Sequence, residues 1–161
     1  MSVLIRTNQA FKSPTVHVSE ELLSLWRSSR QLISSAHEVF GILIGSQSED
    51  GAEFWLEKCT FPMPPDSATR TSFNLQSPHH QDFVESCYAS SEGKLGYLGT
   101  WHTHPEETPV PSSIDVTDWS RCISRNQDRK LVFVIVGQTH LCIFKEINGR
   151  FQIIFKDNIN E

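Results

Sequence analysis

At residues 95–105 the chain reads LGYLGTWHTHP, an apolar strand pattern that runs directly into two histidines and a proline. Side chains at positions i and i+2 of a strand point to the same face, so His102 and His104 can share one ion while Thr103 points away. Pro105 ends regular strand pairing, which places both imidazoles at a strand end where a cleft can open. The stretch therefore predicts a pair of metal ligands at the edge of a sheet.

Two polar residues downstream complete this pattern. Ser112 and Asp115 follow His104 by eight and eleven positions, and Asp115 falls in the first turn of an expected helix, which fixes the direction of its carboxylate. Zinc prefers tetrahedral nitrogen and oxygen ligands, and a catalytic zinc site has three protein ligands and one water. We therefore predict that His102, His104 and Asp115 bind Zn2+, with a water of lowered pKa in the fourth position.

Glu38 is the candidate acid/base, because it directly precedes the apolar, glycine-bounded run Val39–Gly45. Such a run of branched residues is typical of a buried strand. From a neighbouring strand, Glu38 can accept a proton from water and later donate it to a leaving amine. Ser112 can donate a hydrogen bond to a tetrahedral oxyanion. Together these groups predict amide hydrolysis without a covalent intermediate.

The histidine pair and Glu38, each taken alone, also have a purely structural explanation. A His-x-His pair on a strand is, by itself, more often explained by surface or core histidines, and Glu38 alone would be an ordinary surface acid. The spacing of His102, His104, Ser112 and Asp115 is much more specific. With the His, Ser and Asp content of this chain, it arises by chance roughly once or twice per thousand such sequences.

Other chemistry-bearing residues are interpreted as structural. We expect Trp101 and Trp119 to pack beneath the site rather than to contact substrate. The cysteines lie at wide intervals without a C-x-x-C pair, which is typical of reduced, mostly buried thiols in a cytoplasmic protein (Cys59, Cys87, Cys122 and Cys142). The histidines outside the pattern are interpreted as surface residues (His37, His79 and His80).

Length and charge narrow the class of protein. A chain of 161 residues fits one domain, 1–161, that can bury a core without disulfides. Its net charge of -5 argues against a nucleic-acid partner, which normally requires clustered Lys and Arg. The N-terminal segment 1–14 lacks the apolar core of a signal peptide, and no segment approaches a membrane span. The dispersed basic residues are expected on a solvated face (Arg27, Arg30, Arg125, Arg129 and Lys130).

Strand and helix patterns alternate along the rest of the chain. Strands are expected at 16–18, 39–45, 53–59, 71–75, 95–102, 131–136, 141–145 and 150–155. Helices are expected after Ser19, over 78–90, and from Ser112 or Ser113 to about Ser124. The last two strands are expected to form a hairpin through Asn148-Gly149. This order predicts an α+β domain, with a largely antiparallel mixed sheet and two or three helices packed around it.

Two of these helices have an expected apolar face. On the first helix the apolar stripe comprises Leu22, Leu25, Trp26 and Ile33. On the second helix the inner side comprises Phe83, Val84 and Cys87.

Glu38, the His102-Thr103-His104 tripeptide, Ser112 and Asp115 together resemble the JAMM (MPN+) metalloprotease signature, and residues 38–45 are similar to the strand that carries that family's catalytic glutamate. The resemblance covers about residues 16–155. It implies a curved, cytidine deaminase-like sheet flanked by helices, a Zn2+ cofactor, and cleavage after the C-terminal residue of ubiquitin or a ubiquitin-like protein. It also implies His102, His104 and Asp115 as zinc ligands, Glu38 as acid/base and Ser112 as oxyanion donor.

Flanking residues are similar to one branch of that family, the stand-alone bacterial proteins of CBASS antiphage systems. The similarity lies in residues 70–73, 99–106 and 111–115, and in Trp119. It implies that the substrate is a CD-NTase, a cGAS-like nucleotidyltransferase, whose C-terminal tail an E1/E2-like enzyme has joined to target amines.

Three other functions stay open at the level of sequence. One is a JAMM protease that processes a ubiquitin-like or sulfur-carrier protein in another bacterial pathway. Another is a non-catalytic MPN scaffold, against which the complete set of ligands argues. The third is a RadC-like DNA-associated protein, which the acidic charge balance disfavours.

Overall fold

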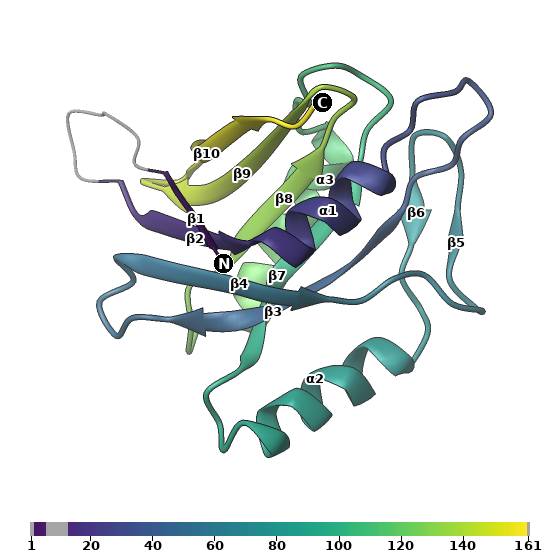
Figure 1. The fold of residues 1–161 in the computed structure, drawn as a ribbon. Coiled ribbons are helices and arrows are strands. Elements are labelled where there is room, and N and C mark those ends of the chain that lie inside the picture. The colour runs from purple at the N-terminus through teal and green to yellow at the C-terminus, as the bar shows by residue number, and fades with distance from the viewer. Residues whose placement is uncertain (1, 6–12, 161) are drawn as a thin grey trace.

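The structure is a computed structural model that describes residues 2–5 and 13–160; residues 1 and 6–12 of the N-terminal segment 1–14 lie outside the described residues. No helix in the described part of the chain is long and apolar enough to span a membrane. The described elements follow one another (Figure 1) in the order β1 (Ser2–Ile5), β2 (Thr15–Ser19), α1 (Glu20–Ser28), β3 (Phe40–Gln47), β4 (Glu53–Cys59), β5 (Ser67–Ala68), β6 (Phe73–Asn74), α2 (His79–Ser90), β7 (Gly96–Thr103), α3 (Ser113–Arg125), β8 (Val132–Val136), β9 (His140–Ile147) and β10 (Arg150–Asn158).

Eight of the described strands form one mixed sheet in the order β1-β2-β4-β3-β7-β8-β9-β10. The β2–β4 and β7–β8 pairs are parallel, and the other neighbours are antiparallel. The sheet is curved, because β2 and β10 contact each other although β4, β3, β7, β8 and β9 lie between them in the sheet order. The β5–β6 hairpin is a separate two-stranded unit. The expected α+β class with a curved, mostly antiparallel mixed sheet is confirmed.

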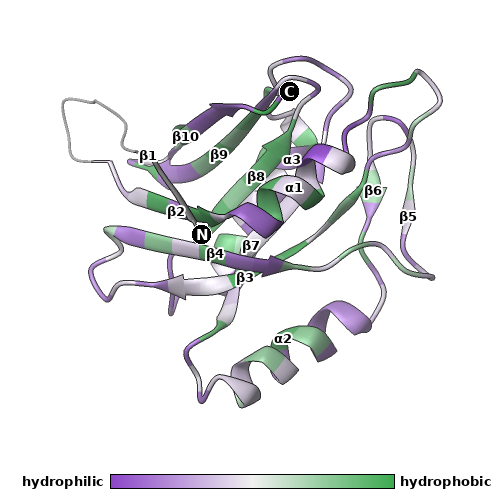
Figure 2. Ribbon diagram, viewed as in Figure 1, coloured by the Kyte–Doolittle hydropathy of each residue, from purple (hydrophilic) through white to green (hydrophobic). Residues whose placement is uncertain are grey.

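Apolar side chains are buried on both faces of the sheet. On one face, Leu22, Leu23 and Trp26 of α1 pack against a cluster that includes Trp101. On the other face, α3 contributes Trp119 to a second cluster. Figure 1 shows α1 in front of the sheet and α3 behind it. Strand β8 is hydrophobic throughout, as its colour in Figure 2 shows, because its alternate side chains enter the two clusters (Val132, Val134 and Val136; Phe133 and Ile135).

The termini of the first helix explain its length. Ser19 is the N-cap, as expected, and its hydroxyl accepts a hydrogen bond from the backbone N of Leu22 at 3.2 Å. The expectation for Ile33 is wrong. The helix ends at Ser28, so Ile33 lies in the following loop and is 66% exposed. Leu23 is buried in its place.

The inner side of α2 also differs from the expected one. Its buried residues are His80 and Cys87, whereas Phe83 is exposed. The expectation that His80 is a surface residue is therefore wrong, and His79 is half-buried. The reason is that His80 uses both ring nitrogens in hydrogen bonds on the core side of the helix. His37 is exposed, as expected.

Three arginines expected on a solvated face are half-buried: Arg129, which donates to the carbonyl oxygen of Tyr97 at 3.3 Å, and Arg27 and Arg30. Arg27 donates to the carbonyl oxygen of Ile159 at 3.0 Å, and Arg30 donates to that of Gln138 at 2.8 Å. Their guanidinium groups bind carbonyls that lie beyond the ends of β10 and β8. All four cysteines are free thiols, and three of them are buried, which agrees with their interpretation.

Apart from the strand at 71–75, every expected strand is present, and its ends lie within three residues of the expected ones. The strand expected at 71–75 is reduced to Phe73–Asn74, because Thr69 and Ser72 form the turn of the hairpin: Thr69 N donates to Ser72 O at 2.8 Å. Strand β1, which was not expected, pairs antiparallel with β2. The hairpin at Asn148-Gly149 is confirmed, since both residues have the positive φ that a tight turn needs.

Candidate metal centre

Pairing of β3 with β7 brings Glu38 to the histidines. Phe40 lies opposite His102 in the register, and the backbone N of Thr103 donates to Val39 O at 2.9 Å. Gly41 is required at the start of β3, because a Cβ there would lie 1.9 Å from the carbonyl oxygen of Thr60. The glycine-bounded run thus lets β3 approach the end of β4 closely and fixes the position of Glu38.

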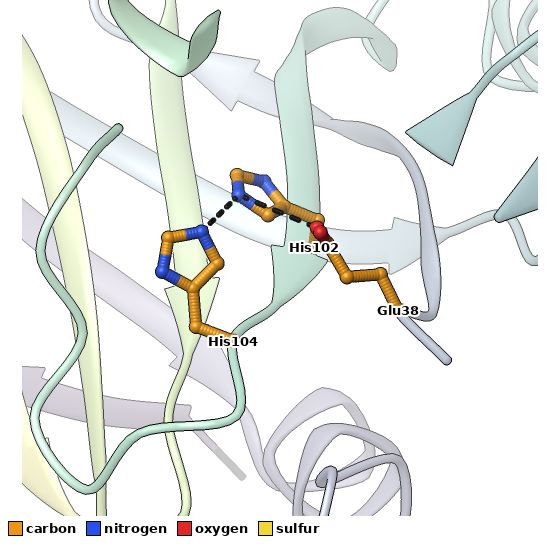
Figure 3. Close-up of side chains that lie close together, drawn as sticks. All are labelled: Glu38, His102 and His104. Carbon is orange, nitrogen blue, oxygen red and sulfur yellow. Dashed lines mark hydrogen bonds and ion pairs between the residues drawn. The ribbon is translucent and has the colours of Figure 1, made fainter. Parts of the chain in front are cut away.

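The ligand atoms of His102, His104 and Asp115 converge at the end of β7. The two Nε2 atoms are 3.0 Å apart, and Figure 3 shows these two ring nitrogens pointing toward each other with Glu38 beside them. Asp115 Oδ1 is 3.2 Å from His102 Nε2, and Asp115 Oδ2 is 3.2 Å from His104 Nε2. Tetrahedral ligands about 2.0–2.1 Å from zinc lie about 3.3 Å from one another. The three side chains therefore fit one zinc ion.

Glu106 orients the ring of His104. Its Oε1 lies 3.0 Å from His104 Nδ1 and also accepts a hydrogen bond from the backbone N of Val110 at 2.8 Å. Since the carboxylate only accepts, Nδ1 carries a hydrogen, so the neutral ring of His104 has its lone pair on Nε2, facing the centre. A carboxylate behind a metal-binding histidine fixes the tautomer and raises its basicity. Sequence reasoning gave Glu106 no such role.

Burial and mutual interactions shift the pKa values of the three potential ligands, Asp115, His102 and His104. Burial opposes ionisation of Asp115, but hydrogen bonds from His102 and His104 outweigh it and hold the pKa of the carboxyl below its usual value. Burial lowers the pKa of His102, which favours the neutral imidazole that binds metal. Burial also acts to lower the pKa of His104, but Asp115 and Glu106 more than compensate and raise it. A metal ion at His104 therefore competes with a proton.

Glu38 has the environment of an acid/base. It is 4% exposed, and its Oε1 lies 4.0 Å from His102 Nε2. Burial raises the pKa of this carboxyl to about 8, with His104 acting in the opposite direction and Asp115 adding to the increase. A bound dication would lower this value by favouring the carboxylate. Such a group can both accept and donate a proton near neutral pH.

Ser112 is the N-cap of α3, and Asp115 is the third residue of that helix. The backbone N of Asp115 donates to Ser112 Oγ at 3.1 Å, and the backbone N of Ser112 donates to Asp115 Oδ2 at 2.8 Å. Of the two serines proposed as the cap, Ser112 therefore has this role. This capping box aims the Asp115 carboxylate, and it leaves the hydroxyl hydrogen of Ser112 available for another acceptor.

Two buried polar residues hold the loop before β3 in place. Thr103 points away from the centre, as expected, and its hydroxyl donates to Gln31 Oε1 at 2.6 Å and accepts from the backbone N of Val39 at 2.9 Å. Gln31 is fully buried and also donates to the carbonyl oxygens of Ala36 and Arg70. Sequence reasoning missed Gln31, because a single glutamine in a loop carries no local signal.

A cavity of about 500 Å3 adjoins the centre. Glu38, Ser112 and Asp115 line one end of it. The β5–β6 hairpin and its flanking residues form one wall, with residues 71–75, and α3 forms the other, with Ile114, Asp118 and Arg121. Trp101 and Trp119 are buried in the cores and do not line the cavity, so their interpretation as packing residues is confirmed.

Comparisons with known proteins agree with this arrangement. The family model described as prokaryotic homologs of the JAB domain matches residues 22–150. A CD-NTase/cGAS isopeptidase of Pseudomonas aeruginosa (strain BWHPSA011 / Pa011) is 33% identical over 129 residues, which cover 80% of each chain. A protein of the same name from Escherichia coli (strain TW11681) is 31% identical over 93% of each chain. Another, from Vibrio cholerae serotype O1 (strain ATCC 39315 / El Tor Inaba N16961), is 34% identical over 81% of this chain and 78% of the relative. The chain thus belongs to the family of prokaryotic homologs of the JAB domain.

Proposed function

We propose that this protein is a cytoplasmic, zinc-dependent isopeptidase of the JAMM type. Its substrate would be a CD-NTase whose C-terminal tail an E1/E2-like enzyme has joined to target amines in CBASS antiviral defence. The names of the relatives support the reaction and the substrate class. The observation that carries the proposal is the convergence of two imidazoles and one carboxylate, with the buried Glu38 directly beside them.

The residues divide the chemistry among them. His102, His104 and Asp115 would hold the zinc, which when bound supplies Lewis acidity that lowers the pKa of water and polarises a carbonyl. Glu38 accepts a proton from the attacking water and donates it to the leaving amine as the C–N bond breaks. The Ser112 hydroxyl donates a hydrogen bond to the oxygen that becomes negative in the tetrahedral intermediate.

The proposal is tested with a defined conjugate. The zinc-loaded protein is incubated with a CD-NTase joined through its C-terminus to the side-chain amine of an acceptor lysine, and the products are identified by intact mass. We expect scission after the last CD-NTase residue, and loss of scission after removal of zinc by a chelator. A ubiquitin-like or sulfur-carrier conjugate tests the alternative substrate class in parallel. Failure to cleave any conjugate, despite stoichiometric zinc, would refute the isopeptidase function.

Replacing Ser112 by alanine is expected to reduce kcat by about 10²- to 10³-fold while zinc remains bound, because a hydrogen-bond donor to the oxyanion is lost. The helix also loses its cap, at a cost of about 1 kcal/mol in unfolding free energy. Single-turnover cleavage and bound zinc are measured together. Ser113→Ala is the matched control, since the neighbouring exposed serine is not the cap. Equal rates in the two variants would contradict the role of Ser112.

Replacing Glu106 by alanine is expected to weaken zinc binding by about 10- to 100-fold, because the ring of His104 loses the partner that fixes its tautomer. The Kd for zinc is measured by competition with a fluorescent chelator. The control is Glu107→Ala, which removes a neighbouring carboxylate whose backbone, rather than side chain, bonds to the β8–β9 turn. An unchanged zinc Kd in Glu106→Ala would show that His104 needs no such partner.

A further inference from the structure

A second group of potential metal ligands lies away from the centre just described and comprises Asp66, His79 and His80. Its geometry differs from that of the metal centre. His80 Nε2 lies 2.7 Å from Asp66 Oδ2, and His80 Nδ1 lies 2.6 Å from Thr60 Oγ1. The two ring nitrogens of His79 likewise bond to a hydroxyl and to a backbone carbonyl. Each imidazole nitrogen already has a hydrogen-bond partner at ordinary distance, so this group is a hydrogen-bonded chain.

The direction of the hydrogen bonds follows from Asp66. Burial raises the pKa of its carboxyl, but hydrogen bonds from the backbone N atoms of Met63, Ser77 and Gln76 and from His80 outweigh this and hold the pKa below its usual range. An ionised Asp66 accepts the hydrogen on His80 Nε2. The neutral ring then accepts at Nδ1 from the hydroxyl of Thr60. Thr60 therefore donates to His80, and His80 donates to Asp66.

At one end, this chain of hydrogen bonds is anchored by Thr60 in the core beneath the metal centre. Thr60 Oγ1 accepts a hydrogen bond from the backbone N of Ile42 in β3 at 2.9 Å. The carbonyl oxygen of Thr60 accepts from Trp101 Nε1 at 2.9 Å, and Trp101 directly precedes the ligand His102. Thr60 is only 4% exposed, so its hydroxyl cannot act as a nucleophile on a protein substrate.

At the other end, Asp66 closes the base of the segment that contains the β5–β6 hairpin. Its Oδ1 accepts from the backbone N atoms of Gln76 and Ser77 at 2.5 and 2.6 Å, and its Oδ2 accepts from that of Met63 at 3.0 Å. One buried carboxylate thus joins the two ends of residues 63–77. The hairpin lies between these two ends.

The far side of the hairpin reaches the catalytic groups. The carbonyl oxygen of Thr69 accepts a hydrogen bond from the backbone N of Glu38 at 2.8 Å. The ring of Phe73 stacks on Phe40 with centroids 4.5 Å apart, and it lies 5.2 Å from the ring of His102. Residues 71–75 line the cavity beside the centre. Figure 1 shows the hairpin standing apart from the large sheet. Arg70 in its turn also donates to the carbonyl oxygens of Ile33 and Ser34, and the Arg70 carbonyl oxygen accepts from Gln31 Nε2. The base and these contacts together hold the hairpin.

We propose that Asp66 and His80 are positioning residues that hold the β5–β6 hairpin as the wall of the substrate cavity, and that they thereby set the affinity for the substrate tail. This inference rests on the proposed function, because it assigns the tail to that cavity. It predicts that breaking the hydrogen bonds of His80 and Asp66 loosens the hairpin and weakens binding of the tail, while His102, His104 and Asp115 stay in place.

Two variants test it, Asp66→Asn and His80→Gln, each loaded with zinc. The probe is a fluorescein-labelled peptide of the last ten residues of the CD-NTase used in the cleavage assay. We expect the Kd of this peptide to rise at least about 10-fold by fluorescence anisotropy, with bound zinc unchanged. Amide hydrogen exchange in residues 66–77 should accelerate at least about 10-fold, whereas exchange in β8 should not change.

The matched control is His17→Gln. It breaks another histidine–carboxylate contact, His17 Nε2 to Glu53 Oε2 at 3.0 Å, on strands remote from the cavity. It should alter neither the peptide Kd nor exchange in the hairpin. Absence of cleavage by the wild type would refute the proposed function. Where the wild type cleaves, an unchanged peptide Kd or an unchanged hairpin exchange in both Asp66→Asn and His80→Gln would overturn the present inference alone.

Discussion

Glu38→Gln is expected to reduce cleavage at least about 10³-fold while the protein keeps its fold and its zinc. Glutamine preserves the shape of the side chain but can neither accept the proton from water nor donate one to the leaving amine. Glu38 Oε1 lies 4.0 Å from His102 Nε2, farther than the 3.2 Å that separates each Asp115 oxygen from a histidine nitrogen. Glu38, His102 and His104 lie close enough to hold a metal ion by themselves, but the longer distance of Glu38 favours the proposed role of an acid/base beside the ligands. Single-turnover cleavage and zinc stoichiometry are measured on the same preparation.

The matched control for this variant is Glu107→Gln, which makes the same chemical change at an exposed position. It should leave both the rate and the zinc content unchanged. Full activity of Glu38→Gln would refute the acid/base role. Loss of zinc together with activity would instead make Glu38 a ligand and would require a different assignment of the fourth coordination position.

Without zinc, the thermal stability of Glu38→Gln should depend on pH differently from that of the wild type. The pKa of Glu38 is raised from 4.5 to about 8 in the folded protein, so the folded state holds a proton that the unfolded state has released between these values. The contribution of Glu38 to stability is therefore fully present below about pH 4.5 and is lost as pH rises through about 8. Glutamine does not titrate. Metal-free Glu38→Gln should consequently unfold at a temperature several degrees above the wild type at pH 8.5, and the difference should shrink toward pH 5.

Local sequence signals accounted for much of the fold and for the position of the centre. The alternation in His102-Thr103-His104 gave the common direction of the two imidazoles, and the helix signal at Ser112 placed Asp115 in a first turn. These predictions succeeded because strand period and helix capping are set by neighbouring residues. The chemical roles of five residues stay predictions, which the cleavage and zinc-binding measurements test (Glu38, His102, His104, Ser112 and Asp115).

Features that depend on distant partners could not be predicted in this way. His80 was expected at the surface because its partners, Thr60 and Asp66, are 20 and 14 residues away and fold back onto it. Glu106 is close in the chain to both of its partners, His104 and Val110, but the local sequence does not show that the loop after β7 folds so that one carboxylate bonds to both. The parallel pairing of β2 with β4 joins residues 15–18 to residues 53–56, and the residue pattern of neither strand identifies that partner. The sequence therefore located the chemistry better than the parts that position it.

His104→Ala is expected to have the opposite signature to Glu38→Gln, because it removes a proposed zinc ligand. Two remaining ligands, His102 and Asp115, cannot complete a tetrahedral site, so we expect loss of stoichiometric zinc and of all detectable cleavage. A metal that binds only the folded state stabilises it in proportion to the logarithm of its concentration over its Kd. The wild type should therefore unfold at a higher temperature in excess zinc than in chelator, and His104→Ala should show no such difference.

Here the control is His37→Ala, which removes an exposed imidazole next to Glu38 in the chain. It should keep the zinc-dependent stabilisation and the activity. If His104→Ala retained one zinc per chain with wild-type affinity, the ion would have to be held elsewhere, and the Asp66, His79 and His80 group would be the first place to look. The hydrogen-bonded geometry of that group argues for the other outcome: removing one imidazole from the end of β7 should abolish zinc binding, catalysis and metal-dependent stability together.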